Sequence, residues 1–492
     1  MNLAVVQYIL GLLIMLFSIT LLPPIGVSLF YDDGSWPAFT YAFVVTLLAG
    51  AVIWFPVHTA EKHLRLRDGF LVVASFWIVL GFFGAVPFLM SEAPVMSFTD
   101  AVFESVSGLT TTGATVLTGL DQLPKSILYY RQQLQWLGGM GIIVLAVAVL
   151  PVLGVGGMSL YRAETPGPAK ETKLRPRITQ TAFTLWKIYF FMTVACGAAY
   201  WAAGMDAFDA ISHSFSTVAI GGFSTHDASF GFFEATSENF AAIEMIAVFF
   251  MFAAGANFSL HFLVWDRQLF TPKISHYLKD PEFRAYVTVL ATVIVITTLY
   301  LHAAGEYESW RESIKKGLFQ AVSISTTTGF TTANYAAWPG ALPVMLLFAS
   351  FIGGCAGSTG GGMKVIRWLL IFKQGLREVR RLIHPSAEIP IRLSTKAVPP
   401  RVVDAVWGFF SVYIVLFGSM MLLLLATGLD QVTAFSAIAA CLNNLGPGLG
   451  DVAGNFASIT DLDKWVCIFA MWLGRLEIFT LFVLFTPAFW QR

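Results

Sequence analysis

Thr110-Thr111-Thr112-Gly113-Ala114-Thr115 is the clearest copy of a short motif that occurs four times in the chain. The other copies are Ala219-Ile220-Gly221-Gly222-Phe223-Ser224, Thr326-Thr327-Thr328-Gly329-Phe330-Thr331 and Asn443-Asn444-Leu445-Gly446-Pro447-Gly448. Aligned on their fourth residues, the motif glycines lie about 109, 107 and 117 residues apart, which is a regular long-period repeat. The sequence therefore predicts one structural unit repeated four times.

A short amphipathic stretch precedes each motif, at 98–107, 208–217, 318–325 and 431–442. Each allows up to about three helical turns, whereas a helix that crosses a bilayer needs about 20 apolar residues. We interpret these stretches as re-entrant half-helices. Non-helical backbone at membrane depth is tolerated only where it is buried in protein or lines water. The four turns are therefore expected to meet around one aqueous axis, which predicts a pore.

Glycine in each turn favours a cation in this pore. Carbonyl oxygens can point at a common axis where φ is positive, which costs a residue with Cβ about 1–2 kcal/mol and glycine almost nothing. The half-helices aim the negative ends of their dipoles at the same centre. Rings of carbonyls replace the hydration shell of potassium in known filters. The candidate K+ selectivity filter consists of Thr111, Thr112, Gly113, Ile220, Gly221, Gly222, Thr327, Thr328, Gly329, Asn444, Leu445 and Gly446.

The composition is that of an all-α polytopic membrane protein. Hydrophobic residues make up 56% of the 492 residues and charged residues 12%, against about 25% charged in soluble domains. The formal net charge of zero gives no indication of a nucleic-acid partner. We predict ten transmembrane helices. They are two N-terminal spans at 3–30 and 38–60, outer spans at 69–90, 179–204, 283–304 and 401–427, and inner spans at 130–155, 238–265, 341–372 and 464–487.

These spans divide the chain into five parts. Residues 1–66 hold the two N-terminal helices, and four pseudo-symmetric helix–pore-loop–helix repeats follow at 67–160, 161–275, 276–390 and 391–492. About twenty of the 30 Lys and Arg lie in the connectors 61–68, 162–177, 266–284 and 373–401 or at the C-terminus. By the positive-inside rule, both termini and these connectors are expected to be cytoplasmic.

The connector 373–401 carries Arg377, Arg380 and Arg381 at helical spacing. Two interpretations stay open for this basic segment. It is either a solvated face beside the membrane that touches anionic lipid, or a docking surface for a cytosolic regulator, and neither excludes the other.

A glycine-rich segment interrupts the third inner span between Gly353 and Lys364. Six glycines in these twelve residues disfavour a continuous helix, at nearly 1 kcal/mol each relative to alanine. We predict that the segment unwinds in the membrane and acts as a gate. Alternatives are a glycine packing seam and a phosphate-binding loop, but the latter would need Ser or Thr after the lysine. The gate residues are Gly353, Gly354, Gly357, Gly360, Gly361, Gly362, Lys364 and Arg475.

Arg475 belongs to this group because it lies in an apolar run, where an arginine costs about 2.5–3.5 kcal/mol. It is expected to bond to carbonyls as a structural charge, to form an electrostatic barrier, or to hold the glycine-rich segment. Glu477 is two residues further on, so on a helix its side chain is expected to point away from that of Arg475 and not to pair with it. Glu104, Asp209 and His213 lie on the half-helices and are expected to support the turns. His226 follows the second turn and is expected to be exposed.

Taken together, these motifs resemble the TrkH-type subunits of the bacterial Trk/Ktr/HKT potassium-transport superfamily. The two additional N-terminal spans favour this type over the shorter KtrB type. The resemblance implies a homodimer with one pore per protomer, and a cytosolic ring of nucleotide-binding TrkA-type subunits that regulates opening. By the same resemblance, the four motif glycines match the filter glycines of the family, residues 353–364 match its intramembrane gating loop, and Arg475 matches an arginine that contacts this loop. The second turn departs from the Thr-Thr-Thr-Gly form.

The sequence thus predicts potassium uptake across a bacterial inner membrane, with K+ as the transported ion and no organic cofactor. Coupled symport of potassium with sodium or protons is a second hypothesis. An intramembrane enzyme that uses Asp209 and His213 is a third, but the sequence has no convincing nucleophile, metal cluster or paired carboxylates for it. We therefore predict that the chain is not an enzyme.

Overall fold

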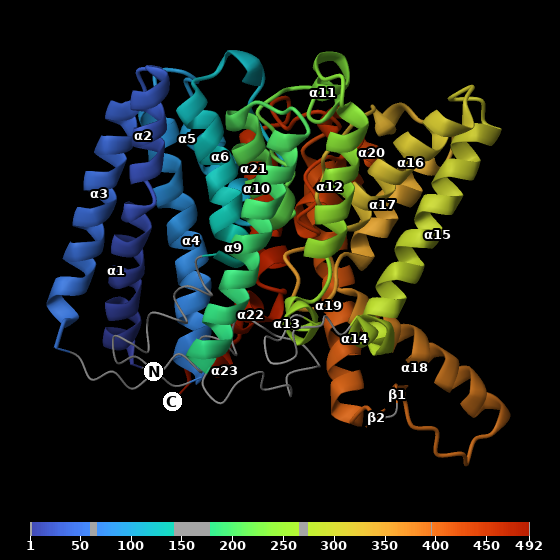
Figure 1. The fold of residues 1–492 in the computed structure, drawn as a ribbon. Helices are drawn as coiled ribbons and strands as arrows, with labels where there is room; N and C mark the ends of the chain where they lie inside the picture. The colour runs from blue at the N-terminus through green and yellow to red at the C-terminus, as the bar shows by residue number, and fades with distance from the viewer. Residues whose placement is uncertain (1, 60–65, 142–177, 265–273, 395, 492) are drawn as a thin grey trace.

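The computed structural model describes residues 2–59, 66–141, 178–264, 274–394 and 396–491. The predicted connector 162–177, parts of the connectors at 61–68 and 266–284, and residues 142–155 of the first inner span lie outside the described residues. Within them the chain is mostly helical (Figure 1). Both termini lie at one end of the helical bundle.

The N-terminal region forms α1 (Leu3–Ile19), α2 (Leu22–Tyr31), α3 (Trp36–Trp54) and the short 3-10 turn η1 (Phe55–Val57). Glycine allows α1 and α3 to pack closely, because a Cβ at Gly11 would meet the backbone of Trp54 at 2.8 Å. Gly50 on α3 meets Met15 on α1 in the same way. The helices α1 and α2, interrupted at Thr20 and Leu21, together make up one span, Leu3–Tyr31, where the first span was predicted.

Four long apolar helices occupy the positions predicted for the outer spans. They are α4 (Leu66–Met90), α9 (Ile178–Ala202), α15 (Pro281–Ala303) and α19 (Pro400–Ala426). Together with the two N-terminal spans Leu3–Tyr31 and Trp36–Val57, they give six spans that are long and apolar enough to cross a membrane, and up to eight if two bent pairs count as spans. The described residues therefore support a multi-pass protein, and the count of ten stays a prediction.

The four predicted half-helices are α5 (Phe98–Leu109), α10 (Ala207–Ala219), α16 (Trp310–Ser325) and α20 (Gln431–Leu442). Each begins after an N-cap residue whose side chain accepts a hydrogen bond from a backbone N–H of the first turn. These N-cap residues are Ser97, Asp206, Ser309 and Asp430. Because Ser309 caps α16, this helix starts eight residues before the predicted position 318. All four lie toward the end of the bundle opposite the termini (Figure 1).

Within the described residues, the inner segments of the second, third and fourth units are broken, whereas the sequence indicated a break in the third alone. The helix α6 (Lys125–Trp136) runs into the π-turn η3 (Leu137–Gly141). The pair α12 (Phe240–Ala254) and α13 (Phe258–Val264) bends by 95°. The expected unwound segment 353–364 separates α17 (Leu342–Ile352) from α18 (Val365–Ile383). A 105° bend follows α21 (Asp461–Arg475) before α22 (Phe479–Phe482) and η7 (Val483–Phe485).

The prediction of continuous helices at 238–265 and 464–487 is therefore wrong. The physical reason is that each break packs against other elements of the protein, and local helix propensity does not report such contacts. In the second unit, for example, Gly255 lies where a Cβ would collide with the hydroxyl of Tyr286.

The remaining elements are short and lie at the two ends of the bundle. They are η2 (Leu120–Gln122), α11 (Gly231–Thr236), α14 (Ser275–Lys279), η5 (Tyr335–Ala337), η6 (Gly450–Val452), α23 (Pro487–Trp490) and an antiparallel pair of strands, β1 (Arg392–Leu393) and β2 (Lys396–Ala397). The helix α18 and this strand pair project from the bundle at the end where the termini lie (Figure 1).

Candidate functional site

The four motif turns share one backbone conformation. The second residue of each is left-handed, with φ of 56° at Thr111, 55° at Ile220, 69° at Thr327 and 53° at Asn444. The fourth residue is a glycine with φ of 80° at Gly113, 81° at Gly222, 86° at Gly329 and 97° at Gly446. Each third residue donates its N–H to the carbonyl five positions earlier in the half-helix, at 2.8–2.9 Å. Different side chains are thus held in the same turn.

These turns form a closed ring in chain order. A Cβ at Gly113 would collide with the carbonyl oxygen of Gly221 in the second turn. The same relation joins Gly222 to the Thr328 oxygen, Gly329 to the Leu445 oxygen, and Gly446 back to the Thr112 oxygen. The backbones of neighbouring turns therefore approach one another too closely for any side chain at the glycine. All twelve candidate filter residues lie in this ring.

Hydrogen bonds between polar side chains of the motifs stabilise three of the turns. Thr110 and Thr112 are joined by a 2.8 Å hydrogen bond, and Thr326 and Thr328 by another of 2.8 Å. In the fourth turn, Asn444 donates to the hydroxyl of Thr112 at 2.9 Å. The second turn has no polar side chain at these positions, and Gln135 from α6 contacts it instead. The sequence reasoning missed this residue.

Polar residues on the half-helices hold the chain just beyond each turn. Nine residues before the motif glycine, Glu104 accepts from the Val116 N–H at 3.1 Å, and Gln320 accepts from the Thr332 N–H at 3.2 Å. His213 occupies the same position in the second unit and lies 3.0 Å from the Ser224 hydroxyl. In the fourth unit, the polar residue lies one position earlier, at Ser436, whose hydroxyl accepts from the Leu449 N–H at 2.8 Å. Glu104 and His213 thus lie where support for the turns was expected.

Asp209 and His213 do not form a side-chain pair. The Nδ1 of His213 lies 2.9 Å from the backbone carbonyl of Asp209, while the Asp209 carboxylate accepts from Thr225 at 2.7 Å. His226 contacts this carboxylate at 3.1 Å and Asp121 at 2.5 Å. His226 is therefore half-buried rather than exposed, because two carboxylates and the ring of Phe232 surround it.

The glycine-rich segment 353–364 lies directly against the ring. The N–H of Gly361 donates to the Thr327 hydroxyl at 2.7 Å, and that of Gly362 to the Asn443 carbonyl at 2.9 Å. Thr359 donates to the carbonyl of Val218, at the end of the second half-helix, at 3.0 Å. Lys364 folds back so that its ammonium group donates to the Gly360 carbonyl. The segment thus contacts the second, third and fourth units.

Glycine in this segment reflects close approach of backbones. Gly353 and Gly362 have φ of 68° and 69°, and a Cβ at Gly361 would collide with the Asn443 carbonyl. The far side of the segment is tied to other elements. Cys355 donates its N–H to the Gly255 carbonyl at 2.9 Å, and the carboxylate of Glu282 on α15 accepts from the Ala356 N–H at 2.6 Å.

Arg475 links this segment to the first unit. Its Nη1 lies 3.2 Å from the Thr111 hydroxyl and 3.5 Å from the Thr359 carbonyl. Its Nη2 donates to the carbonyls of Gly138 and Gly139 in η3. Glu477 does not pair with Arg475, as expected, and binds Arg367 on α18 instead. The guanidinium therefore joins the first turn, the glycine-rich segment and the π-turn η3.

The chain resembles known proteins over its whole length. A family model described as TrkH, cation transport protein, matches residues 35–492. The Trk system potassium uptake protein TrkH of Halomonas elongata is 56% identical over 492 residues, covering 100% of both chains. That of Escherichia coli K12 is 55% identical over the same length and coverage. The crystal structure of the potassium transporter TrkH from Vibrio parahaemolyticus matches with a TM-score of 0.90 and 54% identity, over 100% of both chains.

Proposed function

Because the chain belongs to the TrkH family of cation transport proteins, we propose that it takes up potassium across a bacterial inner membrane through the ring of four turns. The family is one of transporters, in agreement with the prediction that the chain is not an enzyme. The observation that carries the proposal is the closed sequence of contacts in which each motif glycine faces the carbonyl oxygen of the next turn.

The ring offers oxygen atoms to a cation without offering it a carboxylate. The carbonyls of Thr112, Gly221, Thr328 and Leu445 come from four turns of one conformation. Four half-helices end at these turns, so their C-terminal dipole ends add negative potential at the same place. Neutral oxygens bind a dehydrated cation strongly enough for entry and weakly enough for release, as conduction requires.

We assign the glycine-rich segment 353–364, together with Arg475, as the gate. The support is its position, because it hydrogen-bonds the hydroxyl of Thr327 and the carbonyl of Asn443 within the ring. Two positive side chains, Lys364 and Arg475, belong to this gate, and both are bound to carbonyls. Cationic groups next to a cation path raise its electrostatic barrier. Opening requires the segment to release these partners.

We further propose, on the resemblance to TrkH-type subunits, a homodimer whose opening is regulated by a cytosolic ring of TrkA-type nucleotide-binding subunits. In this arrangement both termini are cytoplasmic, as the distribution of Lys and Arg favours. The projecting helix α18 begins at the residue after the gate and carries Arg377, Arg380 and Arg381. It therefore offers a direct connection between a cytosolic partner or the lipid surface and the glycine-rich segment.

Reconstitution in liposomes tests this function. The purified chain is placed in vesicles without a partner subunit, and downhill fluxes of potassium and sodium are measured with and without a deletion within 357–362. We expect potassium-preferring flux that rises on deletion. Absence of potassium flux in both folded proteins would contradict the proposal. Potassium accumulation driven by a sodium or proton gradient alone would indicate coupled symport instead.

A further inference from the structure

The second turn lacks the side chains that brace the other turns. Its third residue is Gly221, where the other turns have Thr112, Thr328 and Leu445. Its first residue is Ala219, where they have threonine or asparagine. Nevertheless, the second turn has the same left-handed residue, the same positive-φ glycine and the same bond to its half-helix as the others. Some other group must therefore hold it.

The side chain of Gln135 on α6 occupies the space that Gly221 leaves. A Cβ at Gly221 would collide with the amide group of Gln135. Gly221 is not among the residues with positive φ, so its backbone conformation is one that any residue adopts. Glycine is thus required here by the neighbouring glutamine, and not by the turn itself.

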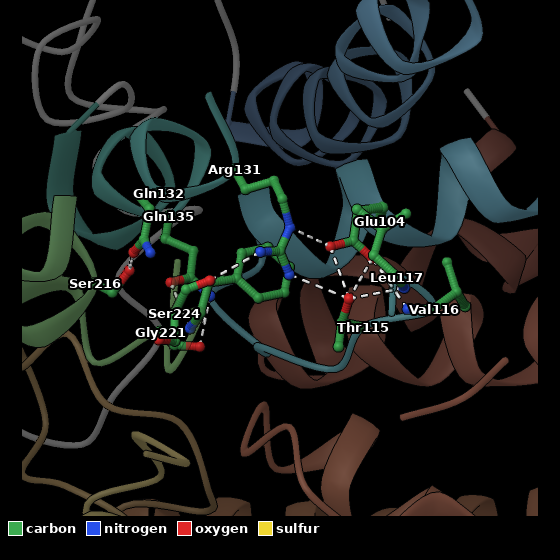
Figure 2. A network of polar contacts seen from close by, with 11 residues as sticks. Glu104, Thr115, Val116, Leu117, Arg131, Gln132, Gln135, Ser216, Gly221 and Ser224 are labelled. Carbon is green, nitrogen blue, oxygen red and sulfur yellow. Dashed lines mark hydrogen bonds and ion pairs between the residues drawn. The ribbon is translucent and has the colours of Figure 1, made fainter. Parts of the chain in front are cut away.

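The amide of Gln135 forms hydrogen bonds on both sides of the motif glycine (Figure 2). Its Nε2 donates to the Gly221 carbonyl at 2.5 Å, and its Oε1 accepts from the Phe223 N–H at 3.1 Å. Gln135 is fully buried, with 0% of its surface exposed. The Gly221 oxygen is the same atom that faces Gly113 in the ring. Gln135 therefore contacts one of the four ring oxygens directly.

Two further residues of α6 form hydrogen bonds with the second unit, and these bonds fix the position of the helix that carries Gln135 (Figure 2). Arg131, one helical turn earlier, donates to the Ser224 carbonyl at 3.0 Å and to Glu104 at 2.6 Å. Gln132 accepts from the Ser216 hydroxyl on the second half-helix. The helix thus contacts the second unit before, within and after its turn, and all three side chains are buried.

We propose that Gln135 is the positioning residue that sets cation preference at the second turn, by supplying from α6 the side chain that the turn lacks. Its N–H fixes the direction of the Gly221 carbonyl, and its oxygen fixes the next peptide. A ring oxygen held in this way cannot move inward to follow a smaller cation. Loss of the amide is therefore expected to favour sodium relative to potassium. The inference rests on the proposed function.

The test compares potassium-to-sodium flux ratios in liposomes for the full chain and its variants. Gln135→Met approximately keeps the volume but removes both hydrogen bonds of the amide. Because only the bond to the Gly221 carbonyl acts on a ring oxygen, we expect the ratio to fall roughly two- to tenfold, the range for one net hydrogen bond. Gln133→Met is the matched control, since Gln133 is buried on the same helix but donates to the Thr20 carbonyl. Its ratio is expected to equal that of the parent.

A reciprocal exchange separates positioning from simple packing. Gly221→Thr alone places a side chain against Gln135 and is expected to lower the ratio. In the double variant Gln135→Ala/Gly221→Thr the second turn gains the residue found in the first and third turns, and its ratio is expected to exceed that of either Gln135→Ala or Gly221→Thr.

A parental ratio in folded Gln135→Met, or a double variant whose ratio does not exceed those of both single variants, would overturn the role of Gln135 while leaving the proposed function intact. A parent chain without potassium preference would overturn both. Monodisperse elution and a cooperative unfolding transition serve as the check on folding for each variant.

Discussion

The carboxylate of Glu104 and the guanidinium of Arg131 form an ion pair of 2.6 Å in which the side chains are 0% and 1% exposed. Glu104 also accepts from the Val116 N–H at 3.1 Å, and Arg131 donates to the Ser224 carbonyl at 3.0 Å. The pair therefore joins the chain beyond the first turn to the chain beyond the second. Both charges have lost their water, so each depends on the other.

Removal of one partner of this pair is expected to destabilise the protein strongly. Glu104→Ala leaves the charge of Arg131 buried and unpaired, which costs about 3–5 kcal/mol. The measurement is the free energy of unfolding in detergent. Glu378→Gln serves as the control, because its pair with Arg381 has side chains 50% and 45% exposed and such pairs contribute about 0–1 kcal/mol. Equal losses in the two variants would contradict the structural role given to the buried pair.

Alanine at a ring glycine is expected to impair transport more than stability. In Gly329→Ala, the positive φ of 86° adds strain of about 1–2 kcal/mol, and the new methyl group collides with the Leu445 carbonyl. We expect at least a tenfold loss of potassium flux or of potassium-to-sodium preference, and the same for Gly113→Ala. Gly428→Ala is the matched control, since Gly428 also has positive φ, 103°, but open space around it. An unchanged flux ratio in both ring variants would count against the filter assignment.

Neutralisation of Arg475 is expected to raise basal flux. Arg475→Gln removes the contacts to the Thr111 hydroxyl and the Thr359 carbonyl, and a hydrogen bond from a charged group contributes about 1.5–3 kcal/mol. If these bonds hold the closed state, flux without a partner rises about tenfold or more. The same flux assay on exposed Arg311→Gln gives the baseline. Parental flux in a well-folded Arg475→Gln protein is the result that would reject the gate assignment.

Stability is expected to fall as pH rises through the titration of His226. Burial lowers the pKa of His226, but its hydrogen bonds to Asp209 and Asp121 and their negative charges outweigh burial and raise the pKa above its ordinary value of 6.5. Because protonation is stronger in the folded state, the stabilising contribution is complete below 6.5 and is lost as pH rises through the folded pKa.

The measurement for His226 is the unfolding midpoint between about pH 5 and about pH 9, in the parent and in His226→Gln. The parent is expected to lose stability over this range, and His226→Gln is expected to lose less. Asp121→Asn, which removes the negative charge 2.5 Å from the His226 Nδ1, should shift the transition to lower pH. A parental pH profile in His226→Gln would exclude His226 as the titrating group.

Local features of the sequence were sufficient to predict the short helices, the turns and the unwound segment. A run too short to cross a bilayer, a glycine where φ is positive and six glycines in twelve residues each have a conformational consequence within a few residues of themselves. The predicted stretches at 98–107, 208–217 and 431–442 accordingly lie within α5, α10 and α20. Only α16 was placed too late, because its polar first turn carries no apolar periodicity.

Contacts between residues far apart in the chain decided the remaining features. Gln135 reaches Gly221 across 86 residues, and Arg475 reaches Gly138 across 337, so neither partner is visible in local composition. The bends after Ala254 and Arg475 carry one glycine each at 255 and 474, a signal that many continuous helices also contain. Four glycine turns and a glycine-rich break could be predicted from the sequence, because backbone conformation is a local property. That the turns meet around one axis was also predicted, because non-helical backbone must be buried or line water in a membrane. The contact of each motif glycine with the carbonyl of the next turn, and the side chains that hold the ring, depend on packing between units far apart in the chain, which only the tertiary structure reveals.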